Sequence, residues 1–246
     1  MAESAREYLL FRLYGPLASW GDIAVGEVRP SFERPSKSAV LGLAAAALGL
    51  RRDDEEGQYR LAQDYGYAVE VQSFGQPLRD YHTVQRPPQR KGADYASRCE
   101  ELRAVPKADL ATTLSYRDYW QDACYVACLW ARNDAPLHAL KEIASALHRP
   151  HFVLYLGRKS CPPALPLQPQ IVVAASVAAA FDGAIFHNDS ILAKIGGDGG
   201  RVRYSDQSLG DSAMKLVRRD QPDSRRRWQF AEREEYRLAV PREVAQ

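Results

Sequence analysis

The hydrophobic pattern at the start of the chain predicts a strand, a long loop and then a helix. Residues Tyr8–Leu13 alternate as a core strand does. Its two faces carry Leu9, Phe11 and Leu13 on one side and Tyr8, Leu10 and Arg12 on the other. After the loop Leu17–Pro35, a helix begins at Ser36 or Ser38, either of which can cap its first free amides. The helix has one apolar face and ends at Gly49, which suits a left-handed C-cap.

The same pattern continues through the rest of the chain. Alternating or strongly apolar runs predict strands at Tyr67–Ser73, Ala123–Trp130 and Gln170–Ala180. Periodic apolar positions predict a short helix at Tyr59–Asp64 and an amphipathic helix at Ala135–Leu147.

The order of these elements predicts an α+β fold. Strand, helix, strand, excursion, strand, helix, strand is typical of the ferredoxin-like fold, with its split βαβ arrangement. We therefore expect residues 1–180 to form a ferredoxin-like RNA-binding core. Residues 181–246 read as a C-terminal β-rich extension, because further strand-like runs occur within Ser205–Val240.

An unusual stretch, residues 78–114, separates the second and third predicted strands. It has few large apolar residues and contains Pro87-Pro88. Long structureless loops are uncommon in compact domains, so we interpret this stretch as a projecting arm, or thumb, that leaves the core and returns. A mobile surface loop is the alternative. The cations of this arm that we expect to contact RNA or protein are Arg86, Arg90, Lys91, Arg98 and Arg103.

Composition and charge limit the possible function classes. The chain has 246 residues and a formal net charge of only +2, so any nucleic-acid surface has to be a local patch. Only seven of the 33 Lys and Arg residues are Lys. An excess of arginine suits phosphate contacts, although a GC-rich genome explains it equally well. Four cysteines without a Cys-x-x-Cys pair, no signal-peptide pattern and no membrane-length apolar run indicate a cytoplasmic protein with free thiols.

The predicted start of the first helix is a candidate anion site. Free helix amides, the helix dipole and Lys37 together favour a phosphate beside Ser36 and Ser38. The preceding loop adds Trp20 and Arg34 to this candidate RNA site. Plain capping by Ser36, with a solvated Lys37, is the alternative.

Two later segments add to this basic set at the ends of predicted elements. Arg117 follows Tyr116, and a turn at Gly157 carries Arg158 and Lys159. Backbone near a glycine can approach phosphates closely. Aromatic residues can stack on bases, and we name Trp20, Tyr116 and Tyr155 as candidates.

Catalytic and metal-binding motifs are scarce in this sequence. We find no Walker loop, no metal-ligand spacing and no G-x-S-x-G elbow, so we expect no cofactor and no metal. The segment Gly196–Gly200 is more typical of a hairpin turn than of a phosphate cradle. The best catalytic candidate is His82, with Tyr81 beside it, as general acid or base of a metal-independent endoribonuclease. A structural histidine at the base of the arm is the alternative.

Four motifs, in the same order along the chain, are similar to those of one protein family. They are R-L-x-G-P-x-x-x-W-G at Arg12–Gly21, L-R-D-Y-H-T-V at Leu78–Val84, aromatic-Arg-[DE]-Tyr at Tyr116–Tyr119 and Y-L-G-R-[KR]-S-C-P at Tyr155–Pro162. With these motifs the chain resembles the CasD family of CRISPR-associated proteins, subunits of the type I-E Cascade surveillance complex. No motif after about Pro169 matches the family.

This resemblance implies a ferredoxin-like core of the repeat-associated RNA-binding superfamily, with a thumb. It implies one copy per complex, bound to the 5′ handle of CRISPR RNA and next to the CasC backbone subunit and the CasA large subunit. Target DNA would be met only through the assembled complex, with no membrane contact. By motif, the handle site would comprise Arg117, Tyr155, Leu156, Gly157 and Arg158.

The resemblance also implies that the chain is not an enzyme, because type I-E systems cut the repeat RNA with a dedicated ribonuclease subunit. The chain departs from the family pattern at Tyr116, where a tryptophan is expected. A tyrosine at this position can still stack on a base.

Overall fold

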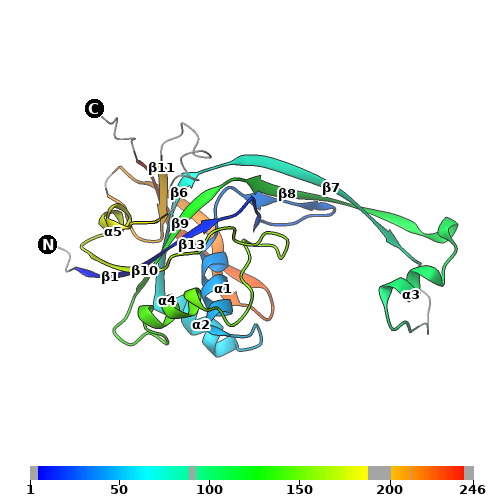
Figure 1. Ribbon diagram of the computed structural model, residues 1–246, viewed down its shortest axis with the longest axis horizontal. Coiled ribbons are helices and arrows are strands. Elements are labelled where there is room, and N and C mark those ends of the chain that lie inside the picture. The colour runs from blue at the N-terminus through cyan, green and yellow to red at the C-terminus, as the bar shows by residue number, and fades with distance from the viewer. Residues whose placement is uncertain (1–4, 89–91, 93, 188–200, 211, 241–246) are drawn as a thin grey trace.

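The computed structural model describes residues 5–88, 92, 94–187, 201–210 and 212–240 (Figure 1). The strands are β1 (Arg6–Tyr14), β2 (Leu17–Ala18), β3 (Trp20–Gly21), β4 (Val28–Arg29), β5 (Ser31–Phe32), β6 (Tyr65–Ser73), β7 (Gln76–Arg86), β8 (Ala111–Gln121), β9 (Cys124–Ala131), β10 (Gln170–Ala174), β11 (Arg201–Ser205), β12 (Met214–Ser224) and β13 (Gln229–Val240). The helices are α1 (Lys37–Leu48), α2 (Glu55–Asp64), α3 (Arg98–Arg103), the 3-10 turn η1 (Lys107–Asp109), α4 (Leu140–His148) and α5 (Val177–Gly183).

A seven-stranded antiparallel sheet forms the body of the protein. Its strand order is β10-β1-β9-β6-β11-β13-β12. The central strands β1, β6 and β9 are buried almost throughout, and they confirm the strands predicted at Tyr8–Leu13, Tyr67–Ser73 and Ala123–Trp130. The protein is therefore a mixed α/β molecule with one large antiparallel sheet and few helices.

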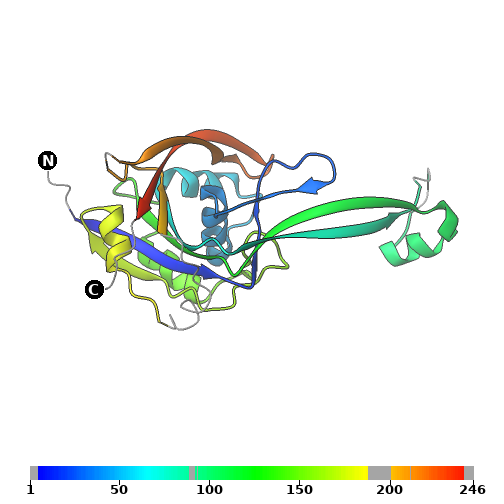
Figure 2. The ribbon, with the colours of Figure 1, turned by 90° about the horizontal axis from the view of Figure 1, so that it is seen from above.

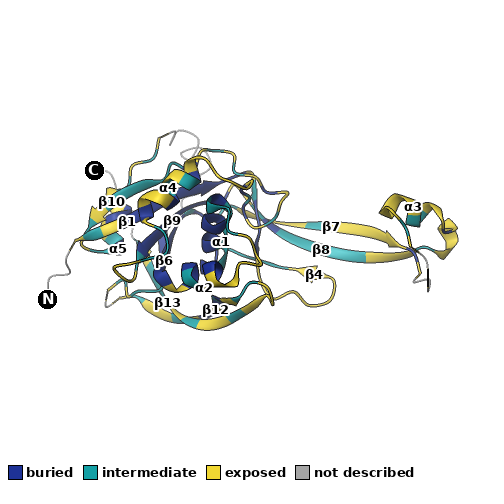
Figure 3. Ribbon diagram, turned by 90° about the horizontal axis from the view of Figure 1, so that it is seen from below, coloured by how far each residue is buried: buried dark blue, intermediate teal, exposed yellow. Residues whose placement is uncertain are grey.

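The two faces of the sheet are covered by different helices. On one face, Leu9, Phe11 and Leu13 join a large core with apolar residues of α1, α2 and α4. On the other face, Tyr8 and Leu10 pack with Val177, Ala180 and Phe181 of α5. The predicted alternation in β1 is thus confirmed, and burial on both faces explains why β1 is apolar at nearly every position (Figure 3).

The C-terminal strands continue the same sheet rather than forming a separate layer. β11 pairs with β6, and β13 and β12 follow outward from it. The predicted β-rich character of this region is confirmed by these strands. The predicted division of the chain at residue 180 stays a prediction, and the predicted hairpin turn at Gly196–Gly200 lies outside the described residues.

One predicted strand is too long. The segment Gln170–Ala180 was expected to be extended throughout, but β10 ends at Ala174 and α5 begins at Val177. Ser176 is the reason: its side chain accepts a hydrogen bond from the backbone N–H of Ala179, which caps the helix. The caps of α1 agree with the sequence, since Ser36 is the N-cap and Gly49 the left-handed C-cap.

The stretch from residue 76 to residue 121 forms a long arm that projects from the body (Figures 1 and 2). β7 and β8 pair in register from Gln76↔Gln121 to Arg86↔Ala111, and α3 lies at the tip. Most of β7 is exposed, whereas β8 becomes more buried toward the body (Figure 3). The predicted projecting arm is confirmed; β7 begins and β8 ends at the body. No described helix is long and apolar enough to cross a membrane.

Candidate RNA-binding site

Three segments that are distant in sequence meet at the base of the arm. β2 pairs with the end of β8, where Ala18 lies opposite Trp120. β4 runs parallel to β8, and Arg29 lies opposite Arg117. The loop after Leu154 joins them through the backbone N–H of Ser19, which donates to the Leu156 carbonyl at 3.0 Å. The structure thus brings these three segments together at one end of β8.

Gly157 lets the loop 155–161 approach the N-terminal segment at van der Waals contact. Its φ is +86°, a left-handed conformation that side chains disfavour. A Cβ atom at this position would lie 1.8 Å from the Ser19 carbonyl oxygen. Leu156 beside it is fully buried, and its N–H donates to the Cys161 carbonyl at 2.7 Å. Leu156 and Gly157 therefore hold the loop in place and expose the residues that follow.

Arg158 ties the loop to the arm. Its guanidinium donates to the carbonyl oxygens of Asp118 at 3.3 Å and of Arg29 at 2.9 Å, and lies 4.7 Å from the ring centre of Tyr119. Both hydrogen-bond acceptors are backbone oxygens, so they orient the cation without neutralising it. Among the described residues, Arg158 forms no ion pair, and its positive charge remains available to an anion at the surface.

The arm places its candidate RNA contacts on two faces. Successive side chains of a strand point to opposite sides, so Tyr116 and Arg117 cannot share a face. Tyr116 lies on one face with Tyr81, at 5.3 Å between ring centres. Arg117 lies on the face of Tyr119, over which the Arg158 guanidinium stacks. The residue predicted to stack on a base and the residue predicted to bind a phosphate are therefore neighbours in the chain that lie on opposite faces of the same two-stranded ribbon.

A bidentate ion pair fixes the aromatic face. Arg79 contacts both carboxylate oxygens of Asp118, at 2.7 Å and 2.9 Å. This hydrogen bonding lowers the pKa of Asp118 and keeps it ionised. The pair lies next to Tyr81 and Tyr116 across β7 and β8, and it fixes the register of the ribbon where the aromatic rings are displayed.

The remaining residues of the loop are accessible. Gly157, Lys159 and Ser160 are exposed, and Tyr155 is half-buried. Lys159 forms no ion pair among the described residues. The cations at the base of the arm are therefore the exposed Lys159 and the half-buried Arg117 and Arg158.

Trp20 does not belong to this accessible surface. Only 1% of its surface is exposed, and it packs edge-to-face against Tyr125 at 5.7 Å between ring centres. A buried indole cannot stack on a base without opening the core. The interpretation of Trp20 as a base-stacking residue is therefore corrected: it is a core aromatic residue.

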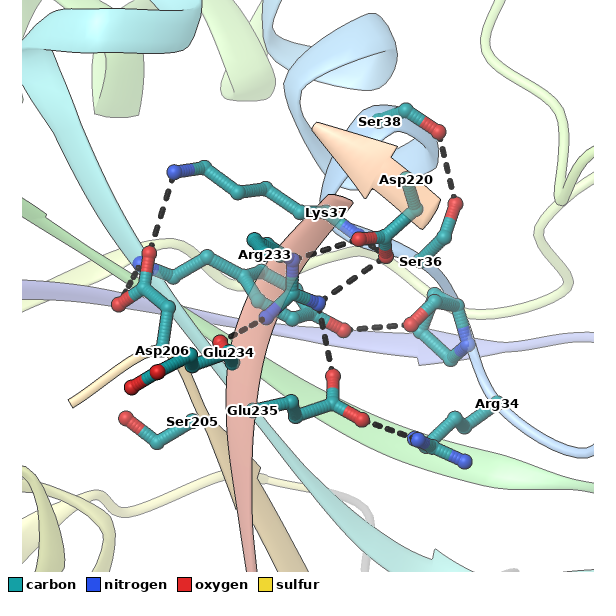
Figure 4. A network of polar contacts seen from close by, with 12 residues as sticks. Arg34, Ser36, Lys37, Ser38, Ser205, Asp206, Asp220, Arg233, Glu234 and Glu235 are labelled. Atoms are coloured by element: carbon teal, nitrogen blue, oxygen red, sulfur yellow. Dashed lines mark hydrogen bonds and ion pairs between the residues drawn. The ribbon is translucent and has the colours of Figure 1, made fainter. Parts of the chain in front are cut away.

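The first helix does bind an anion, but that anion comes from the protein. The backbone N–H of Lys37 donates to the Asp220 carboxylate at 2.9 Å, while Ser36 caps the Ala39 amide (Figure 4). The Ser38 hydroxyl lies 2.9 Å from that of Ser36. Burial alone would raise the pKa of Asp220, but Arg233 holds it below its ordinary value. A carboxylate therefore occupies the position where we predicted a phosphate.

Lys37 and Arg34 are also satisfied internally. The Lys37 ammonium is fully buried and pairs with Asp206 at 3.1 Å. Burial lowers the pKa of Lys37 to about 8, although the Asp206 carboxylate opposes the shift. Arg34 pairs with Glu235, which also contacts Arg233 (Figure 4). Arg34 and Lys37 do not face solvent, and Ser36 and Ser38 serve the start of the helix. Arg34, Ser36, Lys37 and Ser38 therefore do not belong to the candidate RNA site.

The predicted arm cations are placed in part. Arg86 and Arg103 are exposed, and Arg98 pairs with Glu101 and donates to the Gln85 carbonyl at 2.9 Å. Arg90 and Lys91 lie outside the described residues. Arg98 thus shapes the tip of the arm, while Arg86 and Arg103 remain accessible.

His82 lies in an open environment. Its side chain is 50% exposed, and its Nδ1 atom is 4.0 Å from the Asp80 carboxylate. Tyr81 precedes it in β7 and therefore points to the opposite face. The His82 and Tyr81 side chains therefore cannot act together on the same atom of a substrate.

Sequence reasoning missed the contributions of Arg29 and Tyr119. The Arg29 carbonyl and the Tyr119 ring, together with the Asp118 carbonyl, hold Arg158 at the arm base. Tyr119 belongs to the aromatic-Arg-[DE]-Tyr motif, which could have indicated its place. No local signal marks Arg29, because a parallel pairing between β4 and β8 brings it there.

Comparisons with known proteins agree with this arrangement. A family model described as CRISPR-associated protein (Cas_Cas5) matches residues 8–236. The chain is 31% identical over 251 residues to the Escherichia coli (strain K12) protein "CRISPR system Cascade subunit CasD", with 98% of this chain and 100% of that protein covered. The resemblance drawn from the motifs is confirmed by this match.

Two solved structures share the fold. One is a chain of a "CRISPR RNA-guided surveillance complex", with a TM-score of 0.64, 23% identity, and coverage of 95% of this chain and 90% of that one. The other, "Crystal structure of Cas protein", has a TM-score of 0.60, 26% identity, and coverage of 95% of each chain. The family model and the relatives span nearly the whole chain, and the protein therefore belongs to the Cas5 family of CRISPR-associated proteins.

Proposed function

We propose that the protein is a non-catalytic subunit of a Cascade-type CRISPR surveillance complex and holds the 5′ handle of CRISPR RNA at the base of its arm. One observation carries this proposal: Arg117, Arg158 and Lys159 gather where three distant segments meet, and none of them forms an ion pair among the described residues. Uncompensated cations at one surface bind phosphates. The Cascade subunit that is 31% identical over nearly the whole chain supports this assignment.

The two faces of the arm contact different parts of the RNA. Arg117, Arg158 and Lys159 neutralise handle phosphates, while Tyr81 and Tyr116 offer rings on the opposite face for unstacked bases. An RNA strand that uses both sets has to turn around the base of the arm. Such a turn unstacks consecutive bases, so this geometry favours a single-stranded end over a duplex.

The core topology supports the ferredoxin-like assignment. The order β10-β1-β9-β6 is antiparallel throughout, α1 connects β1 to β6, and α4 connects β9 to β10. We infer from this order a split βαβ unit. In this arrangement the arm is an insertion between the second and third core strands.

The arm also provides surface for neighbouring subunits. Its exposed residues toward the tip, among them Arg86 and Arg103, lie well beyond the body and can contact a second protein or the guide duplex (Figure 1). We propose that the CasC backbone subunit and the CasA large subunit are these neighbours, and that target DNA is met only through the assembled complex.

The test is binding of handle RNA to the full chain by fluorescence anisotropy at several salt concentrations. The double variant Arg117→Ala plus Lys159→Ala should bind more weakly, with a salt slope lower by about 1.4, because each lost single-strand phosphate contact removes about 0.7. The matched control is Lys141→Ala plus Arg149→Ala, which removes two exposed cations away from the arm base. Equal affinities and slopes for the two double variants would refute this site.

A further inference from the structure

The tip of the hairpin between β12 and β13 carries an exposed tryptophan among arginines. Trp228 is 58% exposed, and the guanidinium of Arg52 lies 4.8 Å from its ring centre. Arg225 lies 5.9 Å from the same ring, and Arg226 and Arg227 are exposed beside it. The tip packs against the N-terminal turns of α1 and α2, through Arg225 on the Ser38 carbonyl and Ser224 on Glu55, and is separate from the arm base.

Among the described residues, Arg52, Arg225, Arg226 and Arg227 form no ion pair. Arg226 interacts electrostatically with Asp53, but Arg51 binds that carboxylate. The buried Arg34, Arg203 and Arg233 each contact a carboxylate, whereas the buried Arg218 stacks on the Phe32 ring instead. Burial and the nearby charge of Arg52 lower the pKa of Arg225 to about 10, and no carboxylate opposes the shift. A partly buried cation beside a second cation is costly unless an anion joins them.

The backbone at Trp228 is also unusual. Its φ is +57°, in the left-handed region where glycine and asparagine are favoured and an aromatic residue is strained. If this residue served only to form the turn, glycine or asparagine would make the hairpin more stable than tryptophan does. The strained position exposes the indole beside the arginines. A strained, exposed aromatic residue does not stabilise the hairpin, so its position favours a role in binding a ligand.

We propose that Trp228, with Arg52, Arg225, Arg226 and Arg227, forms a second binding site for single-stranded nucleic acid, distinct from the arm base. A base stacks on the exposed indole, and the arginines contact the flanking phosphates, which is how single strands are bound without sequence preference. Arg52 and Arg225 supply the fixed positive charge, and the exposed Arg226 and Arg227 reach the strand.

Acidic residues nearby limit where the phosphates can lie. A groove of about 420 Å³ next to the tip is lined by Glu55, Glu56 and Tyr59 on the α2 side and by Arg225 and Arg227 on the hairpin side. The three carboxylates that line it, those of Glu55, Glu56 and Asp223, disfavour a phosphate inside this groove. The backbone of the strand therefore crosses the outer tip, over Arg226 and Arg227.

The experiment uses the full chain with Arg117→Ala and Lys159→Ala, so that binding at the arm base does not mask the tip. Labelled oligouridine and oligothymidine are titrated by anisotropy. Trp228→Asn should weaken binding about 5- to 150-fold, the range measured when one stacking residue is lost. Asparagine suits a positive φ, so this variant should keep the hairpin folded. Trp228→Phe should retain most of the binding.

Charge variants give an independent readout. Arg226→Gln plus Arg227→Gln should lower the salt slope by about 1.4, whereas Lys141→Gln plus Arg149→Gln, two exposed cations at α4, should leave it unchanged. Tighter binding of oligouridine would assign the site to an RNA strand, and tighter binding of oligothymidine to a DNA strand. Equal binding by Trp228→Asn and its parent would overturn the proposal. The proposal would also be overturned if Trp228→Asn bound nucleic acid as its parent does but lost another Cascade subunit on co-purification. That result would identify a protein contact instead.

Discussion

Gly157 faces the Ser19 carbonyl oxygen so closely that a Cβ atom would lie 1.8 Å from it. Because the opposing atom belongs to the backbone and φ is +86°, no side-chain movement can relieve the contact. We expect Gly157→Ala to lower the free energy of unfolding by about 2–4 kcal/mol, from overpacking and a disfavoured conformation together. Thermal unfolding should show a fall in Tm of roughly 4–16 °C for a chain of this size.

Gly21 provides the matched control for this substitution. It lies in the same N-terminal segment, and a Cβ atom there would meet nothing within 4 Å. Gly21→Ala should leave the Tm close to that of the parent. If both alanine variants unfolded at the same temperature, the contact between the loop and Ser19 would not hold the arm base together.

The N-terminal cations show where sequence reasoning ends. Lys37 was interpreted as an RNA contact because it lies at the start of a helix with free amides, and Arg34 because it belongs to the loop that precedes this helix. Their partners Asp206 and Glu235 come 169 and 201 residues later, directly after β11 and within β13. A local pattern cannot distinguish a cation that binds a ligand from one that joins distant strands.

Other features were predictable because they depend on local pattern. The strands β1, β6 and β9 followed from apolar runs, and the arm followed from the loss of apolar residues between them. The split of Tyr116 and Arg117 between two faces was not predicted, although strand alternation requires it once β8 is known to extend to Gln121. The residues of the candidate site could thus be identified from the sequence. Their arrangement in space could not, because it depends on the pairing of β4 with β8.

The buried ion pair between Lys37 and Asp206 predicts an asymmetry between two substitutions. Asp206 also pairs with Arg132 and accepts from the Tyr67 N–H at 3.2 Å, so Asp206→Ala leaves two cations without their partner. We expect this variant to lose about 3–5 kcal/mol of unfolding free energy. Lys37→Met should cost less than about 1.5 kcal/mol, since Asp206 keeps its other partners. Urea unfolding of both variants measures the difference, and equal losses would contradict this account.

The same lysine predicts a pH dependence of stability. Burial lowers the pKa of Lys37 from 10.5 to about 8 in the folded protein. Between these values the unfolded chain binds the extra proton, so unfolding free energy rises with pH there. The stabilisation is complete above pH 10.5 and is lost as the pH falls through 8. Its size is on the order of 3 kcal/mol.

The variant Lys37→Met isolates this effect from other titrating groups. Tyrosines and cysteines titrate in both proteins and cancel in the difference. Urea unfolding at about pH 7.5 and about pH 10 should show that the parent gains stability relative to Lys37→Met. A constant difference between the two proteins at both pH values would show that the buried ammonium keeps its ordinary pKa.

His82 predicts an absence of catalysis. The histidine is half-exposed, and its nearest carboxylate, Asp80, lies 4.0 Å away, which is beyond hydrogen-bond distance. We expect purified protein incubated with CRISPR repeat RNA in EDTA to leave the RNA intact, with no difference between the parent and His82→Ala. Specific cleavage by the parent that His82→Ala abolishes would assign a ribonuclease function to the arm.

Arg158 and Lys159 are adjacent, yet they should behave differently. Arg158 holds two backbone carbonyls with one planar guanidinium, a geometry that a lysine ammonium cannot reproduce. Arg158→Lys therefore keeps the charge but loosens the loop, and we expect about 1–2 kcal/mol less unfolding free energy together with weaker handle binding.

Lys159→Ala removes an exposed charge with no described partner, so stability should stay unchanged while the salt slope of handle binding falls by about 0.7. Unfolding and binding curves measured on the same two variants separate the positioning of the site from direct contact with RNA. Because Arg158→Lys preserves net charge, a loss of binding in that variant comes from the lost guanidinium geometry, toward the Asp118 and Arg29 carbonyls and toward a phosphate. Handle binding by Arg158→Lys equal to that of the parent would mean that charge alone, and not the orientation of the loop, determines recognition.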